Sequence, residues 1–298
     1  MTIFLTGATG FVGSTILHHL TAQGHHIRCL VRAPEKQYQE DANTLVTRCP
    51  GDVLSPRSLE DAMAGCEAVI HLVGIIREFP RRGIRFQRLH VEATRNILAA
   101  ATKAGIRRYL HMSANGEGPA EATSYLGTKR QAEELVHHNG LDWTIFRPSL
   151  IYGQGGEFTR MLATQIRLAP LVPVIGSGNY RLSPVHVDDI ASAFVSALDR
   201  PASLGKTYCC CGPENYSYNE LIDVFAAGLG KKPARKLHVP APLLRTAAQL
   251  FQGCPLFPVT TEQISLLLRG NSCTDDSWIK ELDIKRTPTA EGIKKALT

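Results

Sequence analysis

The sequence lacks any long apolar run. None of its hydrophobic stretches reaches the roughly 18 consecutive residues that a membrane-spanning helix requires, although 44% of the residues are hydrophobic. No positively charged segment precedes the first apolar residues, so we expect no signal peptide. With a charged content of 20%, these absences favour a cytoplasmic globular protein and exclude a disordered chain.

Closely spaced cysteine pairs are also missing. The chain has eight cysteines, but none of them forms the C-x-x-C pair of zinc and redox sites. Cys209, Cys210 and Cys211 are consecutive, and alternate residues of a strand face opposite ways, so all three cannot converge on one metal ion. We therefore expect no metal site, and we expect all eight thiols to be reduced and structural.

Aromatic residues are scarce, at 7% of the chain. The net charge of +6 is therefore not accompanied by the stacking side chains that nucleic-acid grooves use. We expect no nucleic-acid partner and a small-molecule substrate instead. The sequence leaves the oligomeric state open.

Acidic residues are absent between Val224 and Thr261, a stretch that holds five Lys and Arg residues together with several Leu and Phe residues. One interpretation is a basic surface beside a buried helix. The other is peripheral contact of residues 231–257 with the inner face of an anionic membrane. The second interpretation would favour an apolar substrate, such as a quinone, an isoprenoid or another lipid-like carbonyl compound.

What the sequence does contain, directly after its first apolar run, is a glycine-rich turn at residues 7–13. A helical pattern follows the turn. Strand, tight turn and helix in this order let the backbone approach a pyrophosphate, at which the helix then points its N–H groups. We expect this turn to bind a dinucleotide through Gly7, Thr9, Gly10, Phe11, Val12 and Gly13.

The residue after the second predicted strand, His26–Val31, indicates which dinucleotide is bound. An acidic residue at this position binds the ribose 2′-hydroxyl of NAD, whereas a basic one accommodates the 2′-phosphate of NADP. This chain has Arg32, and the nearest acid is Glu35, beyond Pro34. The guanidinium suits a phosphate, so we predict NADP(H) as the cofactor in preference to NAD(H).

Apolar strand patterns alternate with helical patterns along the first half of the chain. This alternation predicts an α/β fold with a doubly wound parallel sheet, the Rossmann architecture. We assign residues 1–152 to this domain and residues 153–298 to a smaller C-terminal substrate lobe, with some chain returning to the sheet. Ligands bind beyond the carboxyl ends of such strands, which adds these candidate cofactor residues: Asp52, Val53, Leu72, Val73 and Gly74.

The strongest signal for catalysis is Tyr125 followed by Lys129, four residues later on one face of a predicted helix. A nearby ammonium lowers the pKa of a phenol, so Tyr125 is a candidate general acid or base at a carbonyl or alcohol. Lys129 is also placed to hydrogen-bond the nicotinamide ribose. Ser113 ends a strand twelve residues upstream of Tyr125 and is predicted to orient the same substrate oxygen.

Together these residues resemble the extended or atypical branch of the short-chain dehydrogenase/reductase superfamily. Residues 6–13 match its glycine-rich turn, and Ser113, Tyr125 and Lys129 match its catalytic triad. Residues 90–98 are similar to its central helix. Residues 185–191 are similar to the segment of its substrate lobe in which a strand leads into a helix. The resemblance implies that Tyr125 and Lys129 also contact the cofactor.

Residues 147–153 are similar to the loop that lies beside the nicotinamide in that branch, which adds Pro148 and Ile151 to the candidate cofactor residues. One departure is Val73-Gly74, which replaces the alanine-rich step common after the fourth strand. The segment from Pro258 to Ile264 is similar to the sequences of the group related to the 39-kDa accessory subunit of respiratory complex I. In that group, nucleotide binding can persist without turnover.

Three functions follow from these patterns. The first is an oxidoreductase that moves hydride between NADP(H) and a carbonyl or alcohol. The second is a non-catalytic NADP-binding accessory or sensor protein. The third is a sugar-nucleotide epimerase or dehydratase, in which Arg160, Arg167 and Arg181 would clamp a diphosphate.

Overall fold

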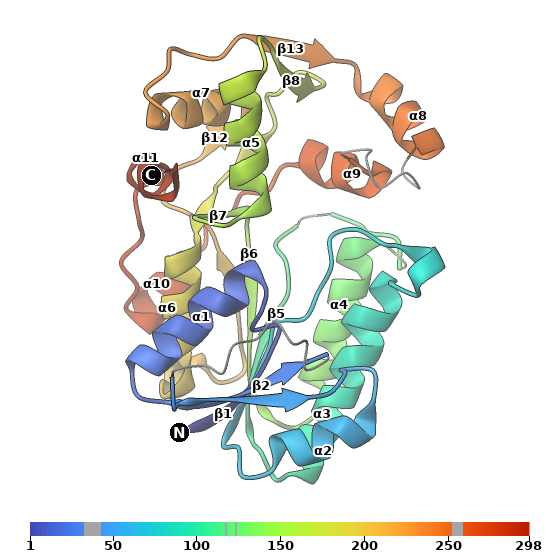
Figure 1. The fold of residues 1–298 in the computed structure, drawn as a ribbon, viewed down its shortest axis with the longest axis vertical. Coiled ribbons are helices and arrows are strands. Elements are labelled where there is room, and N and C mark those ends of the chain that lie inside the picture. Colours follow the sequence, from blue (N-terminus) through green and yellow to red (C-terminus); the bar gives the residue numbers. More distant parts are fainter. Residues whose placement is uncertain (33–42, 117, 123, 252–258, 298) are drawn as a thin grey trace.

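A computed structural model describes residues 1–32, 43–116, 118–122, 124–251 and 259–297. Seven parallel strands form its central sheet in the order β11-β6-β5-β4-β1-β2-β3 (Figure 1). The strands are β1 Thr2–Thr6, β2 His26–Val31, β3 Val46–Pro50, β4 Ala68–His71, β5 Arg108–Met112, β6 Asp142–Pro148 and β11 Lys206–Cys210. The order reverses on either side of β1, so the switch point where such sheets bind ligands lies between β1 and β4.

Helices cover both faces of the sheet, which confirms the predicted doubly wound α/β fold (Figure 1). One face carries α1 Phe11–Ala22, α6 Val187–Leu198 and α10 Ser277–Leu282. The other carries α2 Pro56–Met63, α3 Ala93–Lys103 and α4 Tyr125–His137. Apolar side chains from each face of the sheet pack against these helices in two separate cores, so the strands are buried on both sides and read as continuous apolar runs.

The π-helical turn η2 at Gln87–Glu92 leads directly into α3. Two single-turn 3-10 helices also occur, η1 at Pro80–Arg82 and η3 at Pro201–Ser203. Strand β6 is not at the edge of the central sheet. It pairs with β11, which comes from beyond residue 152.

Most of the remaining chain forms a second, smaller body with its own apolar core (Figure 1). Its helices are α5 Glu157–Leu168, α7 Tyr218–Gly228, α8 Ala241–Phe251, α9 Thr261–Arg269 and α11 Thr289–Leu297. Its short strands pair two by two: β7 Ile151–Tyr152 with β10 Val185–His186, β9 Arg181–Leu182 with β12 Tyr216–Ser217, and β8 Val172–Ile175 with β13 Lys236–Val239. The last helix, α11, packs on α7.

Side-chain caps set where several helices begin. The Ser124 hydroxyl accepts the backbone N–H of Gly127 at the start of α4. Thr260 and Gln263 form a reciprocal capping box at the start of α9, which satisfies two N–H groups that a helix end otherwise leaves unpaired. Among the described residues, no helix has the length and apolar character needed to cross a bilayer.

Candidate active site

The turn between β1 and α1 brings backbone segments close together. Gly7 has a left-handed conformation with φ +77°, and a Cβ there would lie 3.3 Å from the Cβ of Leu72. A Cβ at Gly13 would lie only 2.0 Å from the carbonyl oxygen of Gly7. No larger residue fits this packing of helix on turn, which is the geometry expected of a dinucleotide-binding glycine turn.

The N-terminus of α1 is suited to hold an anion. Its N-cap residue, Gly10, has no side chain that accepts hydrogen bonds from the first turn, and no acidic residue lies in that turn. Thr9 and Gly10 are exposed, Phe11 is half-buried, and Val12 is buried. Because the helix dipole and backbone N–H groups face outward here, the turn fits the pyrophosphate of a dinucleotide.

The candidates for the adenosine side follow β2 and β3. Arg32 is exposed directly after β2, whereas Glu35 and Pro34 lie outside the described residues. Asp52 already accepts the backbone N–H of Leu54 at 2.8 Å, so one of its carboxylate oxygens serves a local turn. Val53 is buried. The contacts that we predict between these residues and the cofactor stay predictions.

The residues after β4 lie between the glycine turn and α4. The N–H of Leu72 donates to the Thr6 hydroxyl at 3.2 Å. A Cβ at Gly74 would lie 2.8 Å from Nζ of Lys129 and 3.6 Å from Nε2 of His90. Gly74 therefore lies directly beside the end of the Lys129 side chain.

Lys129 and Ser113 meet at the carboxyl end of β5. Nζ of Lys129 donates to the carbonyl oxygen of Met112 at 3.0 Å, one residue before Ser113. Burial lowers the pKa of Lys129 to about 8, against the opposing effect of Glu133, which is itself paired with Arg147. Ser113 is buried, and its hydroxyl has no hydrogen-bond partner within the described part of the chain. A hydroxyl in this state suits a ligand oxygen.

Tyr125 is the first residue of α4, and its ring lies edge-on to Phe86 at 5.8 Å and to His90 at 5.5 Å between ring centroids. Burial raises the pKa of its phenol to about 12. The pKa of Tyr125 is thus raised in the protein without a ligand and not lowered as we expected, because burial disfavours the charged phenolate. The phenol holds its proton at neutral pH.

Buried histidines surround the lysine. Nδ1 of His90 lies 2.9 Å from the Thr128 hydroxyl, and Nε2 lies 3.2 Å from the backbone of Ile75. Burial, followed by repulsion from Lys129, lowers the pKa of His90 to about 2 and the pKa of His71 to about 3. Both imidazoles are neutral at neutral pH, so His90 acts as a hydrogen-bonding brace between α4 and the loop after β4.

The end of β6 joins the sheet to the second body. Pro148 is buried and Ile151 is half-buried. The side chain of Asn115 donates to Oδ1 of Asn271 at 2.7 Å, and the Ser149 hydroxyl donates to the carbonyl oxygen of Asn271 at 2.9 Å. The loop after α9 is thus bound to the ends of β5 and β6, beside the candidate catalytic residues.

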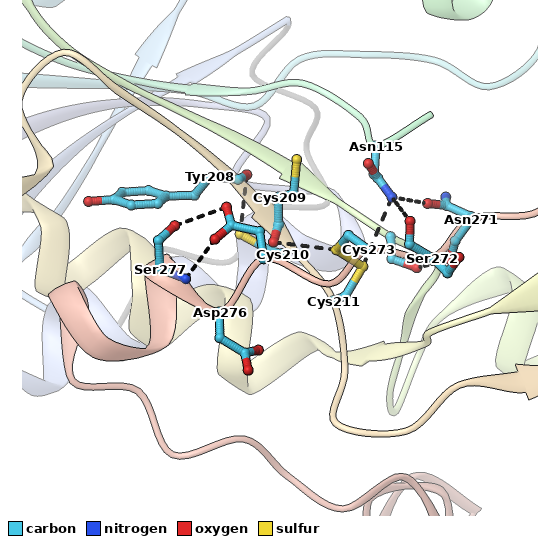
Figure 2. Close-up of a disulfide and its surroundings, with 12 residues drawn as sticks. Asn115, Tyr208, Cys209, Cys210, Cys211, Asn271, Ser272, Cys273, Asp276 and Ser277 are labelled. Carbon is cyan, nitrogen blue, oxygen red and sulfur yellow. Dashed lines mark hydrogen bonds between the residues drawn. A yellow bond between two sulfur atoms is a disulfide. The ribbon is translucent and has the colours of Figure 1, made fainter. Parts of the chain in front are cut away.

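A disulfide joins Cys211 to Cys273 at the same place, with their Cα atoms 6.0 Å apart (Figure 2). Our expectation that all thiols are reduced is wrong for these two residues. β11 ends at Cys210, so Cys211 leaves the strand and meets a loop 62 residues later in the sequence. The five other cysteines in the described residues form no disulfide, and Cys254 lies outside those residues.

One contact at the site was not predicted from the sequence. Oε1 of Glu262, in α9, accepts the backbone N–H of Tyr125 at 2.9 Å. The capping pattern of Thr260 and Gln263 marks the start of α9, but a partner 137 residues away leaves no local signal. In the same described residues, no three His, Cys, Asp or Glu side chains are arranged to hold a metal ion.

The model of the NAD dependent epimerase/dehydratase family matches residues 3–211. The chain belongs to this family. That membership confirms the resemblance to extended short-chain dehydrogenases/reductases, and it agrees with a glycine turn shaped for a nicotinamide dinucleotide. The fold is therefore that of an NAD-dependent epimerase/dehydratase, with its ligand edge at the carboxyl ends of β1 to β6.

Members of the family and related structures are similar over nearly the whole chain. A ceramide reductase from Caulobacter vibrioides is 30% identical over 292 residues, which cover 98% of this chain and 88% of the relative. The mitochondrial NADH dehydrogenase (ubiquinone) 1 alpha subcomplex subunit 9 from Arabidopsis thaliana is 29% identical over 295 residues, 94% of this chain and 71% of that subunit. The crystal structure of gox2253 superposes with a TM-score of 0.78 at 26% identity, covering 99% of this chain and 96% of the other.

Proposed function

We propose that this protein is an NADP(H)-dependent oxidoreductase that reduces a carbonyl group of a lipid-like substrate. The observation that carries the proposal is the meeting of Lys129 with the end of β5, beside the buried and unpartnered hydroxyl of Ser113. Tyr125 lies one turn earlier on the same helix. These three side chains supply a proton, a hydrogen bond and a positive charge around one substrate oxygen.

Each side chain has a separate task in this proposal. Tyr125 donates its phenolic proton to the substrate oxygen, because a pKa raised to about 12 keeps the phenol protonated. Ser113 donates a hydrogen bond to the same oxygen. Lys129 stabilises the phenolate that remains and binds the nicotinamide ribose. A bound nicotinamide would supply the hydride.

The choice of substrate class rests on two observations. The Caulobacter vibrioides relative is a ceramide reductase, which favours a lipid-like carbonyl compound. The guanidinium of Arg181, a candidate clamp for a sugar diphosphate, already pairs with Glu220 at 3.0 Å and with Asn215 at 2.7 Å. Because that cation has partners within the protein, a sugar nucleotide is the weaker proposal.

The preference for NADP(H) over NAD(H) rests on Arg32, which is exposed at the end of β2 where the 2′-phosphate would lie. We expect Arg32→Ala to weaken NADPH binding at least about tenfold and to leave the affinity for NADH within about twofold. Arg57→Ala, an exposed arginine in α2, serves as the control. Tighter binding of NADH than NADPH by the unaltered protein would refute the preference.

Substitution of the phenol tests turnover. NADPH oxidation would be followed with long-chain ketones, ceramide precursors and quinones. Tyr125→Phe should lower kcat at least about a hundredfold and leave NADPH affinity within about twofold. As a control, Tyr180→Phe removes a buried hydroxyl that has no partner among the described residues, and it should leave kcat unchanged. Equal turnover by Tyr125→Phe and the unaltered protein would contradict the role of the phenol.

A second candidate is a nucleotide-binding protein without turnover. The similarity to an NADH dehydrogenase subunit over 94% of this chain favours it. In that case NADPH would bind with Arg32-dependent affinity, but no substrate class would accelerate its oxidation. The same absorbance assay therefore separates the two candidates.

A further inference from the structure

The second body ends in a surface where large apolar side chains point into solvent. Eight large hydrophobic residues are exposed among those the structure describes, and five of them lie in or directly beside α5, β8, β13 and α8. They are Leu168, Leu171, Leu237, Leu243 and Leu250, with exposed fractions of 81%, 42%, 50%, 63% and 73%. We call these five residues the leucine surface.

Four elements carry the leucine surface, at the end of the molecule remote from β1 and β2 (Figure 1). Leu168 ends α5, and Leu171 directly precedes β8. Leu237 in β13 is the register partner of Pro173 in β8, and both are exposed. Because successive residues of a strand alternate, Val172 and Val174 face the core while this ribbon turns an apolar face outward.

Helix α8 continues the same pattern. Ala248 is buried and Leu244 is half-buried, so this side of the helix faces the protein. Leu243 and Leu250 are seven residues apart, which places them on one outward face. The exposed side of α8 therefore combines two leucines with polar residues such as Arg245, a combination typical of helices that lie at a membrane interface.

The charges near the leucine surface are mostly positive; Asp223, which pairs with Lys236 of β13 at 2.6 Å, is an exception. Arg167, Lys232, Arg235 and Arg245 are exposed, and the chain has no acidic residue between Val224 and Thr261. A second copy of the chain would bring like charges together across a symmetric contact. A lipid bilayer offers anionic headgroups to the cations and an apolar interior to the leucines, so it matches both.

We propose that the leucine surface and its flanking cations bind the protein to the face of an anionic lipid bilayer. The five leucines insert among the acyl-chain boundary groups, and the four cations contact lipid phosphates. This peripheral contact needs no membrane-spanning helix. It also does not depend on turnover, so it goes beyond the proposed reductase activity.

The position of α8 gives this contact a consequence for the active site. α8 packs on α9, and Glu262 of α9 holds the backbone N–H of Tyr125. The bilayer would therefore lie next to the helix that covers the start of α4. Residues 252–257 of the stretch predicted from the sequence lie outside the described residues, and the proposal uses none of them.

Co-sedimentation with vesicles tests the proposal on the full chain without nucleotide or substrate. The vesicles are phosphatidylcholine alone or phosphatidylcholine with about one-third phosphatidylglycerol. We expect the unaltered protein to bind the anionic vesicles at about 50 mM salt and to bind at least about tenfold more weakly at about 500 mM salt. It should bind pure phosphatidylcholine at least about tenfold more weakly as well.

Paired variants assign the binding to this surface. Leu243→Ser with Leu250→Ser, and separately Arg235→Glu with Arg245→Glu, should each weaken binding to anionic vesicles at least about tenfold. The matched controls are Leu204→Ser, exposed by 42% just before β11, and Arg57→Glu in α2; both should bind like the unaltered protein. Unchanged thermal midpoints verify that each variant is folded.

Three results would overturn the proposal. One is the absence of vesicle binding at low salt. Another is equal binding by the unaltered protein and both paired variants. The third is a dimer in solution that the leucine substitutions dissociate, without any binding to vesicles, since this would assign the surface to a second copy of the chain. None of these results bears on whether NADPH is oxidised.

Discussion

The two halves of the candidate site are held by different forces. The half that follows β1 is a continuous segment, residues 7–13, in which backbone atoms approach so closely that Gly13 has no room for a Cβ. The half around α4 is assembled from side chains of Ser113, Tyr125 and Lys129, with bracing contacts from His90 and Glu262. Backbone sterics determine the first half, and burial and long-range contacts determine the second.

The two halves also differ in titratable side chains: residues 7–13 have none, whereas the second half has several with strongly shifted pKa values. Burial lowers the pKa of Lys129 to about 8 and raises the pKa of Tyr125 to about 12. A lysine with a pKa near 8 is half neutral at mildly alkaline pH, although a free lysine is then fully charged. Ligand binding to the second half is thus coupled to protons, whereas binding to backbone N–H groups in the first half is not.

The largest effect should come from filling the close contact of the first half. Gly13→Val places side-chain atoms where a Cβ would already lie 2.0 Å from the Gly7 carbonyl oxygen. We expect it to destabilise the protein by about 3 kcal/mol or more and to abolish NADPH binding, measured by urea unfolding and fluorescence titration.

A matched control separates steric conflict from backbone conformation. Gly24, just beyond α1, has φ +78°, but a Cβ there would meet nothing within 4 Å. Gly24→Ala should therefore cost only about 1–2 kcal/mol and leave NADPH affinity unchanged. Normal nucleotide binding by Gly13→Val would show that the turn is not as rigid as its contacts indicate.

The second half should instead depend on a covalent link between distant segments. Reduction of Cys211–Cys273, which closes a loop of 62 residues, should destabilise the protein by about 2–4 kcal/mol. The urea midpoint would be measured with and without a reductant. Cys211→Ser should be equally unstable in both conditions, and a reductant effect that persists in this variant would assign the loss to something other than this bond.

The same difference decided what could be predicted from the sequence. The glycine turn was predictable because strand, turn and helix are consecutive, and the parallel sheet followed from the alternation of apolar patterns. The direction of the pKa shift of Tyr125 was not, because desolvation depends on Phe86 and His90, which pack on its ring only after folding. Nor was the Cys211–Cys273 bond, since alternation within a strand says nothing about a residue just beyond its end.

A proton-linked binding measurement sharpens the comparison further. Well below pH 8, Lys129 is protonated with or without ligand, so it contributes no pH dependence to the affinity there. Bound phosphate and ribose groups favour the ammonium and raise its pKa, so binding takes up a proton above pH 8. NADPH affinity should then fall as pH rises from about 8, by at most about tenfold per pH unit.

Calorimetry in buffers of different ionisation enthalpy measures that proton uptake directly. Lys129→Met should bind NADPH without proton uptake at pH 8.5–9.5, a range set by the pKa of about 8, and its affinity should be flat across it. Proton uptake of the same size in Lys129→Met would assign the proton uptake to another group. The two halves would then not differ in the way that Lys129 implies.

The smallest effect should come from the hydrogen bond that α9 makes to α4. Glu262→Ala leaves the N–H of Tyr125 without its acceptor at 2.9 Å, so the phenol is held less firmly over the site. We expect kcat to fall about threefold to tenfold, which corresponds to the roughly 1 kcal/mol that one hydrogen bond typically contributes. NADPH affinity should stay within about twofold because the glycine turn is untouched.

Glu262→Gln retains an acceptor oxygen and should recover most of the lost kcat. If it is as slow as Glu262→Ala, the negative charge of Glu262 matters more than its hydrogen bond. A parallel loss of NADPH affinity in Glu262→Ala would mean that the two halves are not independent, because a change in α9 would then have reached the turn after β1.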